Sequence, residues 1–268
     1  PLFPAQAGIR DCDVCLVGSE MCIRDRFPIR DVNPTRITPY ITVGLIAVNV
    51  LVFFLWQPQA DDTVASTEFL YEHAAVACEL TTGEPISAQE VRTDVCVEGG
   101  RPIFPDKNVW IAAVVSMFLH GGLFHLLGNM WFLWIFGNNV EEAYGSFGYL
   151  ALYAVAGLAA TFAFVFVNPN ATVPLVGASG AIAGVLGAYA VLFPLHRVLS
   201  LVFVFFVPVP ALFFLGVWFI LQFGISDVTT AWEAHVAGFV VGVLVTLPLR
   251  NRLLGRVGAL HATTRYRF

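Results

Sequence analysis

Long apolar runs separated by short polar segments make up most of the chain after residue 37. The run at 41–56, extended by residues 37–40, reaches the roughly 20 residues that a helix needs to span a bilayer. Tyr40 and Trp56 lie at its two ends, where aromatic side chains favour the membrane interfaces. Four further apolar runs follow later in the chain, at 148–167, 173–193, 198–223 and 234–249.

The stretch at 110–140 has no Asp, Glu, Lys or Arg and is too long for one ordinary span. The Gly121-Gly122 pair inside it predicts a break. We therefore expect an embedded approach segment at 110–124 and a span at 125–140, which Glu141 and Glu142 close. Together the runs predict an all-α polytopic membrane protein, a bundle of six transmembrane helices within residues 39–250.

Two prolines interrupt the run at 198–223. Pro208 and Pro210 each remove a backbone donor, so the sequence predicts a fifth span that is kinked or locally unwound. Because Phe213 and Trp218 follow in the same run, we expect this span to be the mobile element that admits a substrate from the bilayer. The alternative is that these aromatic side chains only face lipid.

The composition agrees with a protein embedded in a lipid bilayer. Hydrophobic residues make up 57% of the chain and charged residues 12%, whereas a soluble domain has about 25% charged residues. The net charge of −5 is unevenly spread, because residues 57–109 hold ten acidic and three basic residues. Nothing in the sequence is typical of a nucleic-acid surface, and we expect neither a metal nor a cofactor.

The arginines predict how the spans are oriented. Arg30 and Arg36 precede the first span, Arg197 lies between the fourth and fifth, and five arginines follow the sixth. Six spans place all of them on one side, which the positive-inside rule makes the cytoplasmic side. Both termini are then cytoplasmic, with residues 27–38 as a lead and 251–268 as a basic tail. The acidic loop 57–109 lies outside.

Cys78 and Cys96 lie in this acidic loop. Thiols outside the cytoplasm can oxidise, so a disulfide is possible. It would close a loop with 17 residues between the cysteines, worth about 3 kcal/mol in the chain-entropy model. The alternative is two unrelated thiols.

Residues 1–26 fit poorly with the rest of the chain. They hold three of the five cysteines and no apolar run of membrane length, and residues 14–26 resemble translated sequencing-adapter read-through. Cys12 and Cys15 have the spacing of metal ligands, but no second ligand pair follows. We treat residues 1–26 as a non-native leader and exclude them from fold reasoning.

Small residues recur four apart in the fourth and sixth runs. Gly180 and Gly184 form one such face, and Gly238 and Gly242 form another. Matching small faces let two membrane helices approach at backbone distance, although the pattern alone usually means packing. Here the contact can bring Ser179, which opens the fourth run, into hydrogen-bond range of a histidine at the start of the sixth.

Polar side chains gather at one depth below the outer face. Ser179, His125 and His235 each open a span that descends from that side, and Asn129 follows His125 by one helical turn. A serine hydroxyl beside an imidazole makes a nucleophile and its base. N–H donors on the second span can stabilise a developing oxyanion. Because the membrane runs hold no Asp or Glu, we expect a dyad, with His235 not oriented by a carboxylate.

The chain resembles the rhomboid intramembrane serine proteases over residues 29–250. The motifs that carry the resemblance are highly specific together: His120-Gly-Gly-Leu-Phe-His125-Leu-Leu-Gly-Asn129, Gly177-Ala-Ser179-Gly180, and Ala234-His235-Val-Ala-Gly238-Phe-Val-Val-Gly242, with Val140-Glu141 after the second span. The resemblance implies Ser179 as nucleophile and His235 as general base. It also implies an oxyanion site made by His125, Asn129 and the backbone at Ala178 and Ser179.

The remaining motif residues are expected to support the site structurally: His120, Gly177, Gly180, Gly238, Gly242 and Glu141. Two positions depart from the family pattern. The Trp-Arg pair of the first loop is missing, since residues 109–112 read Val-Trp-Ile-Ala, and Ala183 stands where some members carry a tyrosine that packs on the catalytic histidine. These departures leave the catalytic residues intact but place substrate docking in question.

The resemblance implies an intramembrane serine endopeptidase that cleaves single-span membrane proteins within the lipid bilayer. We expect it in a bacterial inner membrane. One alternative is a catalytically silent relative that binds membrane clients, but such relatives typically lose the serine or the histidine. Another is a small transporter, which would require paired charges or inverted repeats that the sequence does not show.

Overall fold

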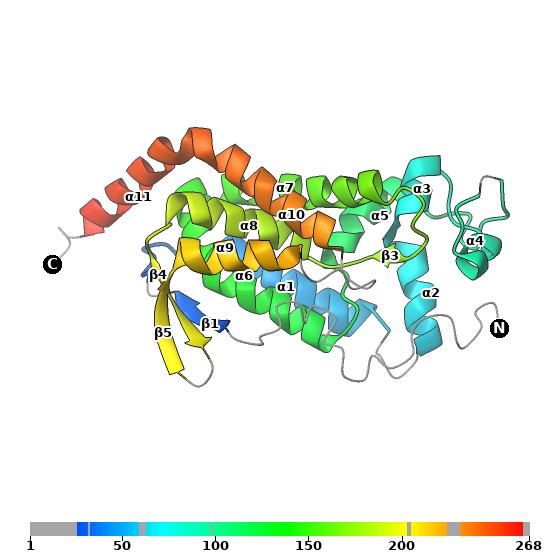
Figure 1. Ribbon diagram of the computed structural model, residues 1–268, viewed down its shortest axis with the longest axis horizontal. Coiled ribbons are helices and arrows are strands. Elements are labelled where there is room, and N and C mark those ends of the chain that lie inside the picture. Colours follow the sequence, from blue (N-terminus) through cyan, green and yellow to red (C-terminus); the bar gives the residue numbers. More distant parts are fainter. Residues whose placement is uncertain are drawn as a thin grey trace.

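The computed structural model describes residues 26–31, 33–58, 63–97, 99–202, 205–223 and 231–264. The fold is mostly helical and elongated, with the helix α8 in the middle of the bundle, small helices at one end and a sheet at the other (Figure 1). The bundle helices are α1 (Tyr40–Leu51, continued by the π-helical turn Val52–Trp56), α6 (Leu123–Tyr144), α7 (Ser146–Val167), α8 (Ser179–Leu192), α9 (Ala211–Gln222) and α10 (Trp232–Thr246).

Helix α8 is the centre of the core. Every residue in it except Ser179 and Val191 is buried, which is typical of a helix that is apolar on all sides. It packs on α6, α7 and α10, and these helices bury its aliphatic side chains together with the ring of Tyr189. The helix begins at Ser179 and not at residue 173, because residues 173–178 form an extended loop with a short strand.

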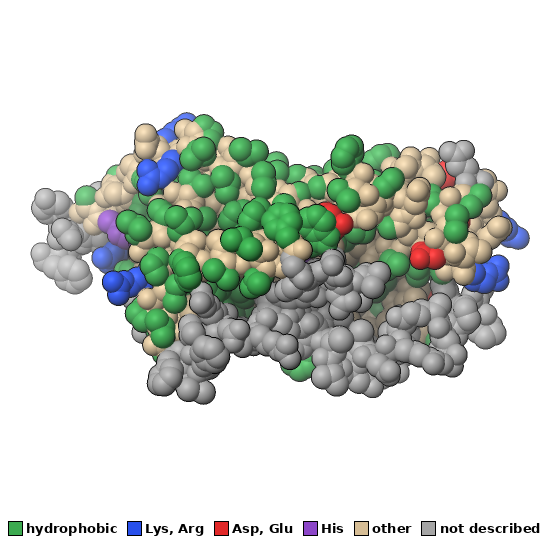
Figure 2. Space-filling model, in the orientation of Figure 1, with side chains coloured by type: hydrophobic (Ala, Val, Ile, Leu, Met, Phe, Trp, Pro, Cys, Tyr) green, Lys and Arg blue, Asp and Glu red, His purple; other side chains and the backbone are tan. Residues whose placement is uncertain are grey.

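Within the described residues, two helices are long and apolar enough to cross a membrane, Ser146–Val167 and the continuous helix Trp232–Ala262. A bent pair, Val109–Phe118 and Leu123–Tyr144, makes a third candidate if it counts as one span. The apolar helices Tyr40–Trp56, Ser179–Leu192 and Ala211–Gln222 are shorter. The number of spans therefore stays a prediction. On the face shown in Figure 2, hydrophobic side chains spread over the upper middle of the molecule, and Lys and Arg lie towards its two ends.

The predicted break before α6 is present. Helix α5 (Val109–Val115) and the 3-10 turn Ser116–Phe118 meet α6 at an angle of 76°, with residues 119–122 between them. Helix α6 runs on to Tyr144, so Glu141 and Glu142 lie inside its last turn and do not follow it.

The prediction of a kinked fifth span over 198–223 is wrong. Strands β4 (Arg197–Val202) and β5 (Phe205–Pro210) form an antiparallel hairpin, and only Ala211–Gln222 is helical. Residues 197–210 are rich in Val and Phe, which suit a strand as well as a membrane helix. Pro208 and Pro210 lie on the edge strand β5, where a missing N–H is tolerated. They therefore do not unwind a helix, and the mobile gate that we based on them loses its support.

The predicted lead and tail both have regular structure. Strand β1 (Arg26–Asp31) pairs with β4 and completes the order β1-β4-β5. Helix α11 (Arg250–Thr264) continues α10 through the 3-10 turn Leu247–Leu249. The proposal that residues 1–26 are not native concerns residues that, apart from Arg26 in β1, lie outside the described part of the chain.

Two carboxylates at the end of α6 bind the start of α1, the lead before it and the C-terminal helix. Glu141 accepts hydrogen bonds from the backbone of Ile41 at 3.0 Å and Thr42 at 2.8 Å, which caps the start of α1. Glu142 accepts from the backbone of Arg36 and lies 2.7 Å from His261 of α11. The position of Glu141 therefore suits the supporting role that its motif implies.

The acidic loop 57–109, called the insertion from here on, folds around its own small core. It contains α2 (Thr63–His73), β2 (Ala75–Val76), α3 (Ala77–Thr82) and α4 (Ala88–Thr93), and a Cys78–Cys96 disulfide closes it. Helix α4 begins with a capping box between Ser87 and Glu90. The insertion contacts the loop before α8, since Cys78 N–H donates to Ala171 O at 3.0 Å and β2 pairs with β3 (Pro174–Leu175).

A buried ion pair lies inside this insertion. Lys107 Nζ is 2.5 Å from Glu79 Oε2 and donates to the backbone carbonyls of Tyr71 and Ala74 at 2.6 and 2.7 Å. Burial raises the pKa of the Glu79 carboxyl and lowers the pKa of the Lys107 ammonium. The pair therefore satisfies charges that would be costly to bury alone.

We expect Lys107→Met to destabilise the insertion by about 3–5 kcal/mol, because it leaves the Glu79 carboxylate buried without its cation. A carboxyl whose folded pKa is raised loses stability as pH rises, so the deficit should shrink on acidification towards pH 4. Hydrogen exchange of the insertion at neutral pH and near pH 4 measures the loss of stability. Arg101→Met, at an exposed position, is the control. Equal protection in the two variants would contradict the expectation.

Candidate active site

Ser179 lies at the end of a loop that backbone contacts hold in place. Gly177 N–H donates to Ser116 O at 2.9 Å. Gly177 has φ of +124°, which L residues rarely adopt, and a Cβ there would lie 2.8 Å from the ring of His125. Glycine is therefore required at this position, and the turn it makes brings the start of α8 close to α6.

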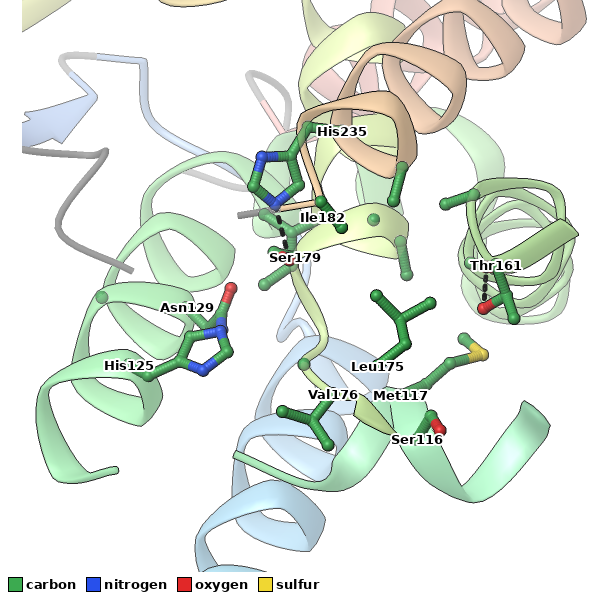
Figure 3. Close-up of a pocket in the computed structure, with 18 of the residues that line it drawn as sticks. Ser116, Met117, His125, Asn129, Thr161, Leu175, Val176, Ser179, Ile182 and His235 are labelled. Atoms are coloured by element: carbon green, nitrogen blue, oxygen red, sulfur yellow. Dashed lines mark hydrogen bonds between the residues drawn. The ribbon is translucent and has the colours of Figure 1, made fainter. Parts of the chain in front are cut away.

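Glycines bring α10 against α8 at backbone distance. A Cβ on Gly238 would lie 2.1 Å from the carbonyl oxygen of Gly180, and one on Gly242 would lie 2.0 Å from that of Gly184. The four glycines thus face one another as their spacing predicts. This approach places His235, in the first turn of α10, beside the start of α8 (Figure 3).

The imidazole of His235 has a partner at each ring nitrogen. Nε2 lies 2.8 Å from Ser179 Oγ, the contact drawn as a dashed line in Figure 3. Nδ1 lies 2.8 Å from Oε1 of Gln222, the last residue of α9. The serine and histidine singled out in the sequence are therefore in hydrogen-bond contact, and a third side chain joins them.

Sequence reasoning missed Gln222. We considered only Asp and Glu as groups that could orient His235, and the membrane runs contain none. An amide side chain in a membrane segment is itself a signal, because polar groups there are costly and usually functional. Gln222 is the one such residue in the run at 211–223.

His125 and Asn129 lie one turn apart on α6 and face the cavity across from Ser179 (Figure 3). His125 Nδ1 accepts the backbone N–H of Gly121 at 3.3 Å, so in the neutral ring Nε2 carries the proton. The side-chain nitrogen of Asn129 is buried and has no hydrogen-bond partner within the described residues. Helix α6 therefore presents two N–H donors to the cavity.

A cavity of about 130 Å³ joins these groups. Its polar side carries the serine, the two histidines and the asparagine, and its other walls are largely apolar (Figure 3). Behind the serine the cavity reaches α7 and the 3-10 turn after α5. These elements, the loop before α8 and α8 itself line this part of the cavity with Met117, Ala160, Thr161, Leu175, Val176 and Ile182.

His120 does not line the cavity. Its backbone N–H donates to Gln57 Oε1 at 3.0 Å, and Gln57 Nε2 donates to the His120 carbonyl at 2.9 Å. Its ring is buried 5.1 Å from the ring of His125. His120 thus lies where it can support the turn before α6, the position that a structural role requires.

Trp218 of α9 lies beside the catalytic histidine candidate. Ala183 of α8 is fully buried facing Gly238 of α10, and the Trp218 ring is 6.2 Å from the His235 ring, tilted by 38°. The aromatic contact missing from α8 is therefore made from α9. Trp110, in the segment where the family's Trp-Arg pair is missing, is exposed on α5.

One group of potential metal ligands occurs in the described part of the chain, formed by Cys78, Glu90 and Cys96. The two sulfurs form the disulfide, so they offer no thiolate to an ion in this oxidised state. The group also lies in the insertion and not in the cavity that holds Ser179.

Comparisons with known proteins point to one family. The Rhomboid domain family matches residues 107–252. The mitochondrial Rhomboid protein 1 of Saccharomyces cerevisiae is 31% identical over 151 residues, which cover 50% of this chain and 40% of that protein. Rhomboid protease GluP of Bacillus subtilis is 31% identical over 150 residues, covering 56% of this chain and 24% of GluP.

The human mitochondrial presenilin-associated rhomboid-like protein is 30% identical over 163 residues, covering 60% of this chain and 34% of that protein. The chain thus spans less than half the length of these relatives. The matched domain begins at Lys107 and extends past α10, so it includes the serine, the two histidines and the asparagine of the cavity. Since that domain occupies more than half of the sequence, the chain belongs to the rhomboid family of membrane proteins.

Proposed function

We propose that the protein is an intramembrane serine endopeptidase that cleaves single-span membrane proteins. The observation that carries the proposal is the 2.8 Å separation between Ser179 Oγ and His235 Nε2 at the edge of a cavity. A silent relative that only binds clients would have no need to maintain this contact. The name of the Bacillus subtilis relative, a rhomboid protease, supports the same reaction.

The reaction would begin when Ser179 Oγ attacks the carbonyl carbon of the scissile peptide bond. The hydroxyl proton passes to His235 Nε2, and the imidazolium then donates it to the leaving amine. A water molecule, deprotonated by the same nitrogen, hydrolyses the acyl-enzyme and frees the serine. The proton transfers need only the two side chains that are already in contact.

The negative charge on the former carbonyl oxygen needs donors. His125 Nε2–H, the side-chain amide of Asn129 and the backbone N–H at the start of α8 surround the cavity beside Ser179. The amide of Asn129 has no partner within the described residues, so a donor is free to meet a charge that develops in the transition state. Ala178, just before the nucleophile, is buried in the same loop.

The proposed setting is a cell membrane with both termini in the cytoplasm. In that orientation the insertion and the cavity lie towards the outer face. The Cys78–Cys96 disulfide supports this placement, because disulfides persist in oxidising compartments. A substrate would then be cut near the outer end of its span.

A fluorophosphonate probe tests the assignment of the nucleophile. The wild-type protein should be labelled at Ser179 alone, because among the described serines this is the one whose hydroxyl contacts an imidazole. Ser179→Ala and His235→Ala should lose the label, and Ser146→Ala, changed at the start of α7, should keep it. Labelling that persists in Ser179→Ala protein, or peptide mapping to another serine, would contradict the proposal.

A further inference from the structure

Gln222 is a buried polar side chain that contacts a member of the proposed catalytic pair. It ends α9, is 3% exposed, and its amide makes two hydrogen bonds to described residues. Nε2 donates to the backbone carbonyl of Trp218, one turn earlier, at 3.0 Å. Oε1 lies 2.8 Å from Nδ1 of His235. One of its two partners thus belongs to the proposed catalytic pair.

These bonds fix which way the amide points. If the amide were flipped, its oxygen would face the carbonyl oxygen of Trp218, and two acceptors cannot share a hydrogen bond. The amide oxygen therefore faces the imidazole, and an amide oxygen can only accept. The proton on the neutral His235 ring must then be on Nδ1, which leaves Nε2 free to accept the proton of Ser179.

We propose that Gln222 is a positioning residue that holds His235 in the Nδ1–H tautomer and turns its Nε2 towards Ser179. The inference rests on the proposed protease function and adds a third member to the pair. Gln222 does not touch the reacting atoms and acts through the histidine. Gln222 would orient the histidine and fix its tautomer, as the carboxylate does in the soluble Ser-His-Asp triads, but without a negative charge.

Among the described residues, Gln222 is the hydrogen-bond acceptor at Nδ1 of His235. His125 is the titratable group facing it from α6, across the cavity, and can only donate through Nε2. Glu233 opens the same helix, but its carboxylate accepts from Asn168 at 3.1 Å. Within the described residues, no carboxylate is hydrogen-bonded to the imidazole, so the amide is the acceptor that sets its tautomer.

The test compares two variants of the full chain in proteoliposomes that contain a single-span reporter substrate. Gln222→Met keeps the length of the side chain and removes the acceptor, and we expect kcat to fall by about 10²-fold, with KM little changed. Gln222→Glu restores an acceptor and adds a negative charge, which favours the imidazolium. We expect it to recover most of the rate at high pH and to move the acid limb of the pH–rate profile to higher pH.

The matched control is Leu221→Met, which places the same new side chain at the neighbouring exposed position. Thermal melting checks that each variant is folded. A second readout needs no activity: in Ser179→Ala protein, the ¹⁵N signals of His235 should report Nδ1–H, and Gln222→Met should abolish that preference.

The outcomes separate the inference from the function on which it rests. If Ser179→Ala cleaves the substrate as fast as wild type, the protease proposal fails. If Ser179→Ala is inactive while Gln222→Met matches Leu221→Met and keeps the tautomer, only the role of Gln222 fails. A Gln222→Glu variant that is slow at every pH, with an unmoved acid limb, also overturns the inference.

Discussion

Ser179→Ala is expected to lower the rate of cleavage of a membrane substrate by roughly 10⁴-fold or more, by analogy with soluble serine proteases. The serine and the histidine form one functional unit joined at 2.8 Å, so His235→Ala should cost about as much. The double variant should be little worse than either single one, because removing the second member of a broken unit changes nothing further. Single-turnover cleavage in proteoliposomes measures all three rates.

The control for these variants is Ser146→Ala, which removes a hydroxyl at the start of α7, outside the cavity. It should cleave at the wild-type rate. Additive losses in the double variant would mean that the two side chains act independently, in conflict with a shared proton transfer. Substantial cleavage by Ser179→Ala would sink the assignment altogether.

The second large effect is expected from Gly242→Val. Its side chain would have to enter space 2.0 Å from the carbonyl oxygen of Gly184, and backbone atoms cannot move aside as a flexible side chain can. Helix α10 should therefore move away from α8 and carry His235 out of reach of the serine. A misplacement of 1 Å can cost about 10² in rate, so we expect the cleavage rate to fall by at least that factor.

Gly216→Val is the matched control, because a Cβ at Gly216 on α9 meets nothing within 4 Å. Both variants should still insert into membranes, which a protease-protection assay can verify. The Gly242 variant alone should lose activity and melt at a lower temperature. Near wild-type cleavage by Gly242→Val would refute the close contact between the helices.

Much of the helical framework can be predicted from local sequence. The break at Gly121-Gly122 and the small-residue faces of α8 and α10 depend on residues near one another in the chain, and the structure has both. The site residues Ser179 and His235 could be paired because each opens an apolar run. The spacing of the glycines then predicts the contact that brings them together.

The features that were missed depend on long-range pairing or on subtler polarity. The run at 198–210 is apolar enough for a helix, but it folds back on itself as a hairpin and also pairs with residues 26–31. Gln222 carries no charge, and its bond to His235 joins two helices across a loop. Neither contact produces a repeating spacing of hydrophobic residues, so the hydrophobic pattern alone could not predict it.

The sheet also has a consequence for how the chain is made. Strand β1 pairs Asp31 with Val198, a partner 167 residues further along the chain. At a synthesis rate of about 5–20 residues per second, β1 has to wait roughly 8 to 33 s for that partner to leave the ribosome. The first strand to be translated can therefore join its sheet only after most of the bundle has been made.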